Sequence, residues 1–281
     1  MTGMKNLFSG VDAPLVSIVI PTRHRIALLN RAVQSVDAQA YDPIQVVIVD
    51  NCSDEPIRPA DIQTRHSCLI VRTDSMLPAS RARHFGVQKA LGELICFLDD
   101  DDVYKENKIR DEVDYLRDHP QAEFVYGQTV HVGPDGAILV VSRGEPEISS
   151  FLRWRYVHLN SLMVRQSVYQ QEPFNFKMTT FEDVEFVGRL IRRGHGAYIP
   201  DIHSVWYRDG RPDQLTRRNW RRSYVNWKIL CAEFRPEILR DKGLTSFYHK
   251  KMLILSLMFF DFKQTFVSAL ALINTILMRR G

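Results

Sequence analysis

The first 100 residues contain four short apolar runs, and these runs constrain the fold more than any other feature of the sequence. Each run is rich in branched side chains and too short for a helix, which is typical of buried parallel strands. The runs are residues 16–20, 46–49, 68–71 and 94–98, and segments with helical spacing cover residues 25–39 and 81–91, the second closed by Gly92. This alternation predicts an α/β fold, with a Rossmann-like, mostly parallel sheet and helices on both faces.

Polar residues follow directly after three of the four runs. They are Pro21-Thr22-Arg23, Asp50-Asn51 and the four aspartates from Asp99 to Asp102. The carboxyl ends of parallel strands lie at one edge of the sheet, and ligands bind outside that edge. We therefore expect the three polar clusters to line one ligand site.

The four consecutive aspartates repel one another, and a bound divalent cation explains why they follow an apolar strand. Carboxylates are hard oxygen ligands suited to Mn²⁺ or Mg²⁺, and such sites leave several positions to substrate phosphates and water. The metal acts as a Lewis acid that neutralises a leaving diphosphate. The alternative is an acidic turn in which Asp102 caps a helix that begins near Lys105.

A second acidic pair, Glu182-Asp183, lies at the start of a predicted helix over residues 181–193, which Gly194 ends. The helix dipole stabilises carboxylates there, which is the structural explanation of the pair. A carboxylate at this place would also serve as a general base for an acceptor hydroxyl. Between the two acidic sites, the sequence predicts a hairpin, residues 124–130 and 137–141 around a turn at 133–136, and a strand over residues 159–165.

Five segments, in this order, resemble the inverting glycosyltransferases of family 2, which have the GT-A fold and build bacterial cell-surface polysaccharides. They are residues 16–22, 46–53, 82–86, 97–102 and 181–183. The resemblance implies a GT-A catalytic domain over residues 1–205, with a nucleotide-sugar half (14–102) and an acceptor half (103–205). Residues 206–281 would form a basic and apolar helical C-terminal extension.

The resemblance also implies which residues bind a nucleotide diphosphate sugar, which we expect to be UDP-linked. Pro21 and Thr22 would line the nucleotide pocket, and Asp50 would bond the uracil base. Arg83 would stand near the base or the diphosphate. Asp99 and Asp101 would be the aspartates of a DXD motif, with Asp99 nearer the ribose and Asp101 bound to Mn²⁺ or Mg²⁺.

Three residues depart from the family pattern. His84 stands where the family usually has asparagine, and Arg23, a candidate ligand of the diphosphate, stands where many relatives have tyrosine or asparagine. Asp100 replaces a small residue. It adds a carboxylate on the donor side, and it leaves open which of Asp100, Asp101 and Asp102 binds the metal.

On the acceptor side, the resemblance makes Asp183 the catalytic base, with Glu182 placing the acceptor or supporting the site. A mobile loop after the base-bearing helix is expected over residues 203–211. Arg208 or Arg211 in this loop would grip the diphosphate in bidentate fashion. His203 would complete the metal site, although a histidine at a strand end is more often structural.

The C-terminal part of the chain is basic. Residues 208–281 carry 15 Lys and Arg against 6 Asp and Glu, a net charge of +9, whereas residues 1–207 carry 22 against 27, a net charge of −5. Its apolar runs, residues 252–260 and 266–278, are shorter than the roughly 20 residues that a spanning helix needs. The pattern predicts contact of residues 217–281 with an anionic membrane surface. The alternative is a helical hairpin packed against the catalytic domain or a second subunit.

The expected activity is transfer of a sugar to a hydroxyl of a saccharide or of a lipid-linked saccharide, such as a lipopolysaccharide core. A metal-dependent nucleotidyltransferase is disfavoured because residues 21–25 contain no glycine, and a non-catalytic nucleotide-sugar-binding membrane scaffold is the other alternative. Nucleic-acid binding is not expected, because the rest of the chain is acidic. Four scattered cysteines without CxxC spacing, and a first apolar run too short for a signal peptide, predict a cytoplasmic protein, peripheral on the inner face of the plasma membrane. Oligomerisation stays open.

Overall fold

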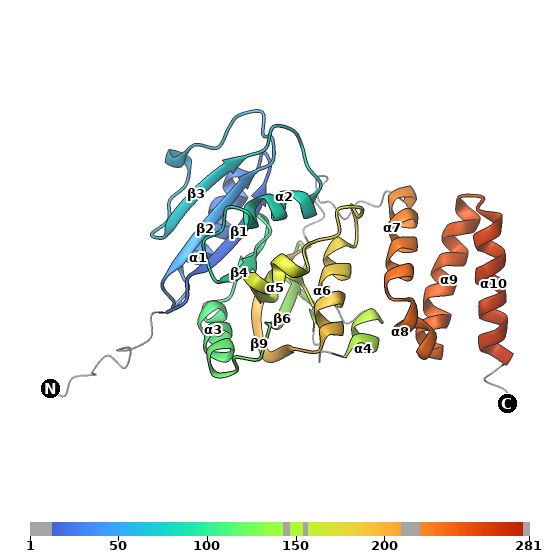
Figure 1. The fold of residues 1–281 in the computed structure, drawn as a ribbon. Coiled ribbons are helices and arrows are strands. Elements are labelled where there is room, and N and C mark those ends of the chain that lie inside the picture. The colour runs from blue at the N-terminus through green and yellow to red at the C-terminus, as the bar shows by residue number, and fades with distance from the viewer. Residues whose placement is uncertain (1–12, 143–146, 154–156, 209–219, 278–281) are drawn as a thin grey trace.

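The computed structural model describes residues 13–142, 147–153, 157–208 and 220–277 of the chain. In the N-terminal half, strands and helices alternate as the sequence predicts (Figure 1). The elements there are β1 (Val16–Thr22), α1 (Ile26–Asp37), β2 (Ile44–Asp50), the 3₁₀ turn η1 (Pro59–Asp61), β3 (Ser67–Arg72), α2 (Ala79–Val87) and β4 (Leu94–Phe97).

One mixed sheet runs through the described residues, in the order β3-β2-β1-β4-β8-β6-β9-β5, with β7 paired to β6 outside this path. Strands β1 to β4 are parallel to one another. β8 (Leu162–Arg165) is antiparallel to both β4 and β6 (Phe124–Val132), and β9 (Gly196–Tyr207) is parallel to β6. β5 (Val103–Tyr104) is antiparallel to β9, and β7 (Ile138–Ser142) is antiparallel to β6. The predicted α/β class is confirmed, and the antiparallel strands all belong to the second half of the catalytic body.

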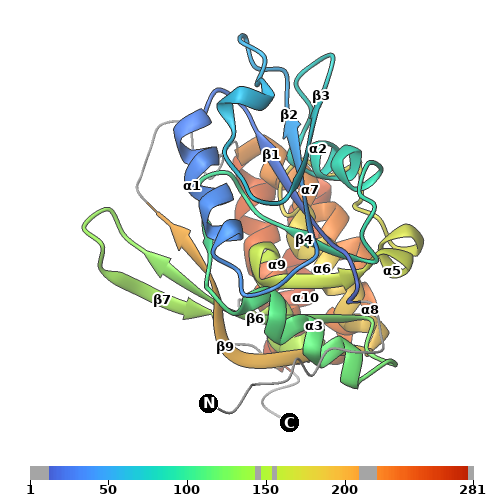
Figure 2. The ribbon, with the colours of Figure 1, turned by 90° about the vertical axis from the view of Figure 1, so that its left-hand side faces the viewer.

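Helices cover both faces of the sheet because successive residues of a strand face opposite sides. In β1, Ile18 and Ile20 pack with α1 and α3 (Lys108–Asp118). Val19 faces the other way, toward α2 and α6 (Glu182–Arg193). The close approach of α2 needs Gly86, where a Cβ would lie 2.5 Å from Cγ1 of Val19. Figure 2 shows the sheet with α1 and α2 on its two sides and the β6–β7 hairpin extending away from the body.

Several boundaries differ from the prediction. The helix expected over residues 81–91 ends at Val87, so Gly92 does not close it. Gly92 lies instead against β1, where a Cβ would stand 2.6 Å from the carbonyl oxygen of Leu15. The strand expected over residues 159–165 begins as the 3₁₀ turn η2 (Leu159–Ser161) before β8. Residues 203–207, expected in a mobile loop, are instead the end of β9, whose pairing with β6 continues to Tyr207.

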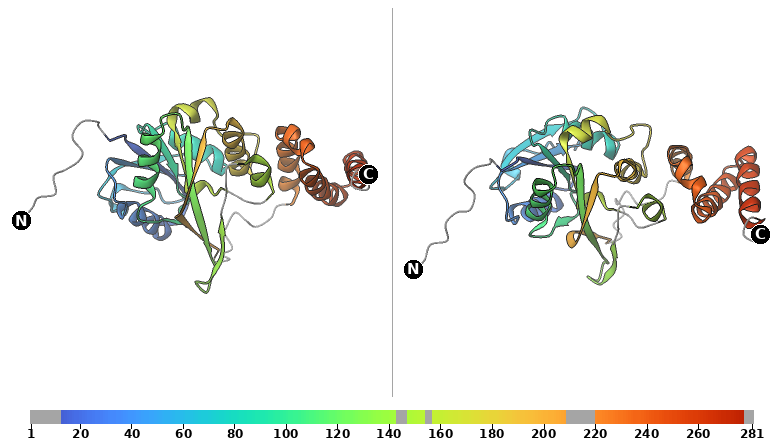
Figure 3. Two further views of the ribbon diagram at one scale, coloured as in Figure 1. Left: turned by 90° about the horizontal axis from the view of Figure 1, so that it is seen from below. Right: turned by 60° about the horizontal axis from the view of Figure 1, so that its bottom comes forward.

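The C-terminal extension is helical, as predicted, and lies at the end of the molecule away from β1, β2 and β3 (Figure 1 and Figure 3). It contains α7 (Trp220–Glu233), α8 (Arg235–Arg240), α9 (Lys242–Met258) and α10 (Phe262–Leu277). Trp227, Phe234 and Tyr248 share one apolar core with Phe186 of α6 and with α4 (Ile148–Leu152). One face of α9 therefore packs on the catalytic body. Within that body, the short helix α5 (Gln166–Gln171) follows β8.

Candidate active site

The loop after β4 holds the aspartates beside the end of β1, because β1 and β4 are neighbouring strands. The hydroxyl of Thr22 donates to Oδ2 of Asp100 at 2.7 Å, and Arg25 donates to Oδ1 at 3.0 Å. Burial is the largest influence on Asp100 and raises its pKa. Its side chain is 7% exposed. The predicted donor contact of Asp100 is therefore corrected, because this carboxylate points inward and ties the acidic loop to β1.

Asp102 is also a structural residue of this loop. Its side chain is fully buried, and it accepts hydrogen bonds from Nδ2 of Asn160 at 2.6 Å and from the backbone N–H of Tyr207 at 3.0 Å. Burial, together with the charges of Asp99 and Asp101, raises its pKa well above the usual range. The alternative of a cap near Lys105 is wrong, because the next helix begins at Lys108. Asp102 joins the acidic loop to η2 and β9.

Asp99 and Asp101 are the carboxylates of this loop that reach the surface, with side chains 29% and 15% exposed. Arg25 lies 3.4 Å from Oδ2 of Asp101, and Arg31 donates to the backbone carbonyl of Asp101. Burial acts to raise the pKa of Asp99, but the Arg83 guanidinium outweighs it and holds that pKa below its usual range. The pair predicted as the DXD aspartates is thus the pair that the fold leaves accessible.

Arg83 of α2 connects the acidic loop to the base-bearing helix. Its guanidinium lies 2.5 Å from Oδ1 of Asp99 and 3.5 Å from Oε1 of Glu182. Burial raises the pKa of Glu182 to about 7, and the neighbouring Asp183 adds to the rise. The residues predicted for the donor side and those predicted for catalysis therefore meet in one site.

Asp183 is the second residue of α6, and its Oδ1 accepts the backbone N–H of Val184 at 2.8 Å. Directly before the helix, Phe181 adopts φ 61°, a left-handed conformation that is rare for a bulky residue and is often found at functional sites. Asn226 of α7 secures this turn by donating to the hydroxyl of Thr180 at 2.7 Å. The C-terminal extension thus helps to place the carboxylate of Asp183.

Sequence reasoning missed two residues of η2 and its N-terminal flank. Oδ1 of Asn160 accepts the backbone N–H of Asp99 at 3.1 Å. Burial lowers the pKa of His158, against the charges of Asp99 and Asp183, which act to raise it. Its Nδ1 is buried and has no hydrogen-bond partner among the described residues, and its ring lies 5.2 Å from that of Trp206. Single polar residues in an apolar stretch carry no spacing signal, so only the fold brings them to the aspartates.

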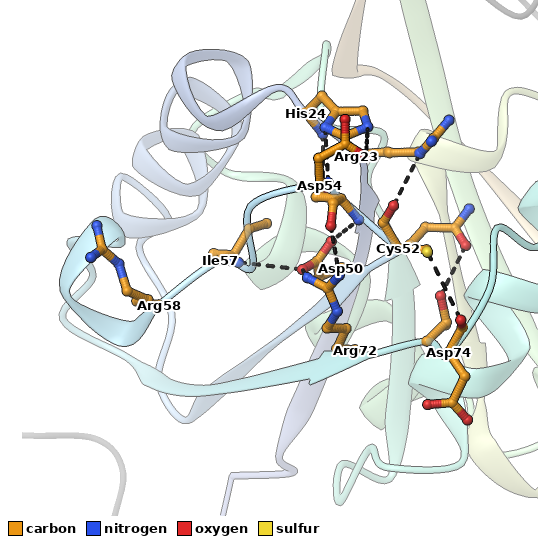
Figure 4. Close-up of polar contacts among 12 residues, drawn as sticks. Arg23, His24, Asp50, Cys52, Asp54, Ile57, Arg58, Arg72 and Asp74 are labelled. Atoms are coloured by element: carbon orange, nitrogen blue, oxygen red, sulfur yellow. Dashed lines mark hydrogen bonds and ion pairs between the residues drawn. The ribbon is translucent and has the colours of Figure 1, made fainter.

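At the end of β2, Asp50 organises the loop that follows (Figure 4). Its Oδ1 accepts the backbone N–H of Ser53 at 2.9 Å, and its Oδ2 lies 3.0 Å from Arg72 and accepts the N–H of Ile57 at 3.3 Å. Although burial opposes it, these hydrogen bonds and Arg72 hold the pKa of Asp50 below its usual range. The residue is 1% exposed. Asp50 therefore holds the loop after β2, where the nucleobase is predicted to bind, through these buried contacts. Its direct contact with the base stays a prediction.

The structure shows the contacts of Arg23 and His84, two of the residues that depart from the family pattern. Arg23 is exposed, and its Nε donates to the carbonyl of Cys52 at 3.3 Å, which holds the side chain across the loop after β2 (Figure 4). The ring of His84 lies 3.1 Å from the Tyr169 hydroxyl and packs edge-on against Phe176. His84 therefore interacts with the acceptor half of the body, while Arg23 and the half-buried Pro21 stay candidates for the donor side.

The structure does not bring His203 to the acidic loop. Its Nδ1 lies 2.7 Å from Oε1 of Glu112, and the same carboxylate pairs with Lys108 at 2.5 Å, all inside the core. His203 precedes Tyr207, the partner of Asp102, by four strand residues, which is about 13 Å. The predicted role of His203 as a metal ligand is therefore wrong. Arg208 is exposed and lies 5.0 Å above the Trp206 ring, and Arg211 lies outside the described residues.

The acidic loop can be compared with the needs of a metal. Within the described ranges, no group of three or more His, Cys, Asp or Glu side chains is arranged to hold an ion. Sites for Mg²⁺ use one or two carboxylates and complete their shell with substrate phosphates and water. Asp101 and Asp99 fit that kind of site, because both are accessible hard-oxygen ligands on one loop.

Known proteins resemble this chain in sequence and in fold. The family model of glycosyl transferase family 2 matches residues 17–194, more than half of the chain. The chain belongs to glycosyl transferase family 2. Among curated relatives of this family member, the putative teichuronic acid biosynthesis glycosyltransferase TuaG of Bacillus subtilis is 25% identical over 77% of the chain and 87% of its own length. The amylovoran biosynthesis glycosyltransferase AmsB of Erwinia amylovora is 27% identical over 46% of each chain.

The fold of this family 2 member is also that of solved structures. Residues 1–349 of S. aureus TarS in complex with UDP-GlcNAc match it with a TM-score of 0.66, at 15% identity, over 92% of the chain and 79% of that one. The predicted GT-A fold is confirmed by this match. The alignments cover 38% and 46% of the first two curated relatives, so the chain spans less than half of their length.

Proposed function

We propose that this family 2 member is an inverting glycosyltransferase that moves a sugar from a UDP-linked donor to a hydroxyl of a saccharide or lipid-linked saccharide in cell-surface polysaccharide synthesis. The observation that carries the proposal is the connection from Asp99 through Arg83 to Glu182, next to Asp183. It unites an accessible acidic loop at the sheet edge with a carboxylate at a helix start. TuaG and AmsB, whose names refer to polysaccharide biosynthesis, support the choice of pathway class.

In the proposed reaction, Asp183 accepts the proton of the acceptor hydroxyl. The oxygen then attacks the anomeric carbon of the donor sugar, the bond from that carbon to the diphosphate breaks, and the diphosphate leaves with the bonding electrons. Attack opposite the leaving group inverts the configuration. The proposal needs an ionised Asp183, and Glu182, whose pKa burial raises to about 7, can stay protonated beside it near neutral pH. Glu182 is then a positioning residue that lowers the negative charge around the base.

Mn²⁺ or Mg²⁺ would be held by Asp101 with Asp99, and when bound it would neutralise charge on the leaving diphosphate. Arg25 and Arg83 already counter the charge of these two carboxylates. Arg83 would lie against the base or the diphosphate, and Arg208 would approach the diphosphate from the end of β9. The solved TarS complexes with UDP and UDP-GlcNAc support a UDP-linked donor.

The experiment is a donor-binding and turnover assay on the purified chain with Mn²⁺. Binding of UDP-GlcNAc and of other UDP, GDP and dTDP sugars is measured by thermal shift, and turnover by release of the nucleotide diphosphate. Asp183→Asn should lower UDP release by about a hundredfold or more, because a general base is lost, and should leave the donor-induced shift unchanged. Asp101→Asn should remove the Mn²⁺ dependence of donor binding.

Asp111→Asn is the control, because Asp111 is a carboxylate of α3 outside the acidic loop and should keep full activity. If no nucleotide sugar is bound or turned over with any metal, the enzyme proposal fails and the scaffold alternative gains. If the chain turns over a nucleoside triphosphate instead of a nucleotide sugar, the nucleotidyltransferase alternative replaces the glycosyltransferase proposal. Loss of donor binding in Asp183→Asn would move Asp183 from catalysis to the donor site.

A further inference from the structure

In the hairpin of α9 and α10, small polar side chains lie buried where the two helices meet, and many large apolar side chains are exposed on the outside. Ser256 and Ser268 are fully buried between helices. The Thr265 hydroxyl donates to Ser256 at 2.9 Å, and Gln264 donates to Ser268 at 3.2 Å. Small polar residues at helix–helix contacts, with apolar residues outside, are characteristic of helices whose outer surface meets lipid.

The outer surface of this hairpin is apolar. Of the nineteen large apolar side chains that are exposed among the described residues, nine lie between positions 254 and 273, and they are 45% to 77% exposed. A monomer in water rarely leaves so many together. These side chains, named the hairpin patch here, are Ile254, Leu257, Met258, Phe260, Phe262, Phe266, Val267, Leu270 and Ile273.

Contacts with α7 fix the position of the hairpin patch. Phe260 and Phe262 stand on either side of Asp261, which accepts the Tyr224 hydroxyl at 2.6 Å and lies 3.5 Å from Nζ of Lys228. These contacts with α7 fix the turn between α9 and α10. Along α10, the exposed Phe262, Phe266, Leu270 and Ile273 follow helical spacing and so form one stripe. Figure 1 and Figure 3 show α10 at the outer edge of the molecule.

The charge around the hairpin patch identifies the occupant. Lys250 and Lys263 are exposed beside it, and residues 220–277, which include the hairpin, carry 9 Lys and Arg against 4 Asp and Glu. A second copy of this chain would place the same positive charge against it, whereas anionic phospholipid would neutralise it. No helix in the described ranges is long and apolar enough to cross a bilayer. We propose that the hairpin patch lies in the interface of an anionic phospholipid bilayer, with the flanking lysines at the phosphates.

The hairpin is also connected to the proposed base. Lys251 of α9 lies 3.7 Å above the ring of Trp227 and 5.0 Å above that of Phe181, the residue directly before Glu182-Asp183. The turn between α9 and α10 and the start of α6 lie on the same side of the molecule in Figure 1. Docking would therefore hold the catalytic body at the bilayer surface, which suits a lipid-linked acceptor. This last step rests on the proposed function, while the docking itself does not.

Vesicle sedimentation of the purified full chain tests the docking without any donor or acceptor. The probes are vesicles of phosphatidylcholine alone and of phosphatidylcholine with phosphatidylglycerol, at low and high salt. We expect binding to the anionic vesicles, weakened by salt. Phe262→Ser with Phe266→Ser should weaken it by about tenfold or more, because two large apolar side chains are removed from the interface.

Leu91→Ser with Ile138→Ser is the matched control, since these side chains are 75% and 67% exposed elsewhere and should leave binding unchanged. Circular dichroism and the melting temperature establish that each variant is folded. The proposal is overturned if the unaltered chain stays in the supernatant at low salt, or if the Phe262/Phe266 variant binds as well as the control. It is equally overturned if light scattering gives a dimer that this variant turns into a monomer. UDP release, measured separately in solution, reports on the proposed function alone.

Discussion

Glu182 offers the sharpest test of the electrostatics of the site. It is 12% exposed beside Arg83 and Asp183, and burial raises its pKa to about 7 from the ordinary 4.5. The folded protein therefore holds a proton on Glu182 that the unfolded chain releases between these two values. Stability from this group is fully present below the unfolded pKa and is lost as the pH rises through the folded pKa.

The size of the effect follows from the two pKa values. A shift of one unit corresponds to about 1.4 kcal/mol, and for a rise of the pKa from 4.5 to about 7 linkage gives a loss of about 2–3 kcal/mol between pH 5 and pH 8. Glu182→Gln keeps the shape and hydrogen-bonding ability of the protonated side chain and cannot ionise. The variant should therefore lack this loss and should become more stable than the unaltered chain by about 2 kcal/mol as the pH approaches 8.

Urea unfolding of both proteins from pH 5 to pH 8 measures the difference, and the comparison cancels the titration of other carboxylates that both share. Glu106→Gln, in the exposed turn before α3, is the control and should show no difference in pH dependence. A stability difference that stays constant over this pH range would refute the reasoning. A difference of opposite sign would show that Arg83 holds Glu182 ionised in the folded state.

Two further predictions concern residues that the fold alone assigned. Asn160→Ala should lower the free energy of unfolding by about 1–3 kcal/mol and weaken donor binding, because the buried Asp102 loses its Nδ2 donor and the N–H of Asp99 its acceptor; urea unfolding and the thermal-shift assay measure the two effects. Unchanged donor binding would mean that the acidic loop keeps its shape without Asn160. His203→Gln should lower stability by a similar amount, about 1–3 kcal/mol, because Oε1 of the buried Glu112 loses its contact with the His203 ring. UDP release by this variant, titrated with Mn²⁺, should show the same metal dependence as release by the unaltered chain. A changed dependence would restore His203 to the metal site.

The sequence by itself determined the features that depend on local pattern. Short apolar runs between helical segments predicted the parallel strands β1 to β4. The buried β1, β2 and β4 need apolar side chains on both faces, whereas β3 lies largely exposed at the sheet edge. Strand ends carrying Thr22, Asp50 and the aspartates predicted one site at the sheet edge, because parallel strands present their carboxyl ends together. Gly194 predicted the end of α6, where it adopts φ 80°.

Tertiary structure decided what depends on contacts between segments distant in the chain. Four adjacent aspartates are alike in sequence, and only Thr22, Asn160 and Tyr207, which approach from other elements, separate the buried Asp100 and Asp102 from the accessible Asp99 and Asp101. A histidine has no local signal for its partner, so the burial of His203 against Glu112 appears only in the folded chain. The apolar runs of α9 and α10 predicted helices. Which side of each helix packs was set by contacts of α9 with α7 and α8 and of α10 with α9, because a helix with apolar residues on several sides leaves that choice to its neighbours.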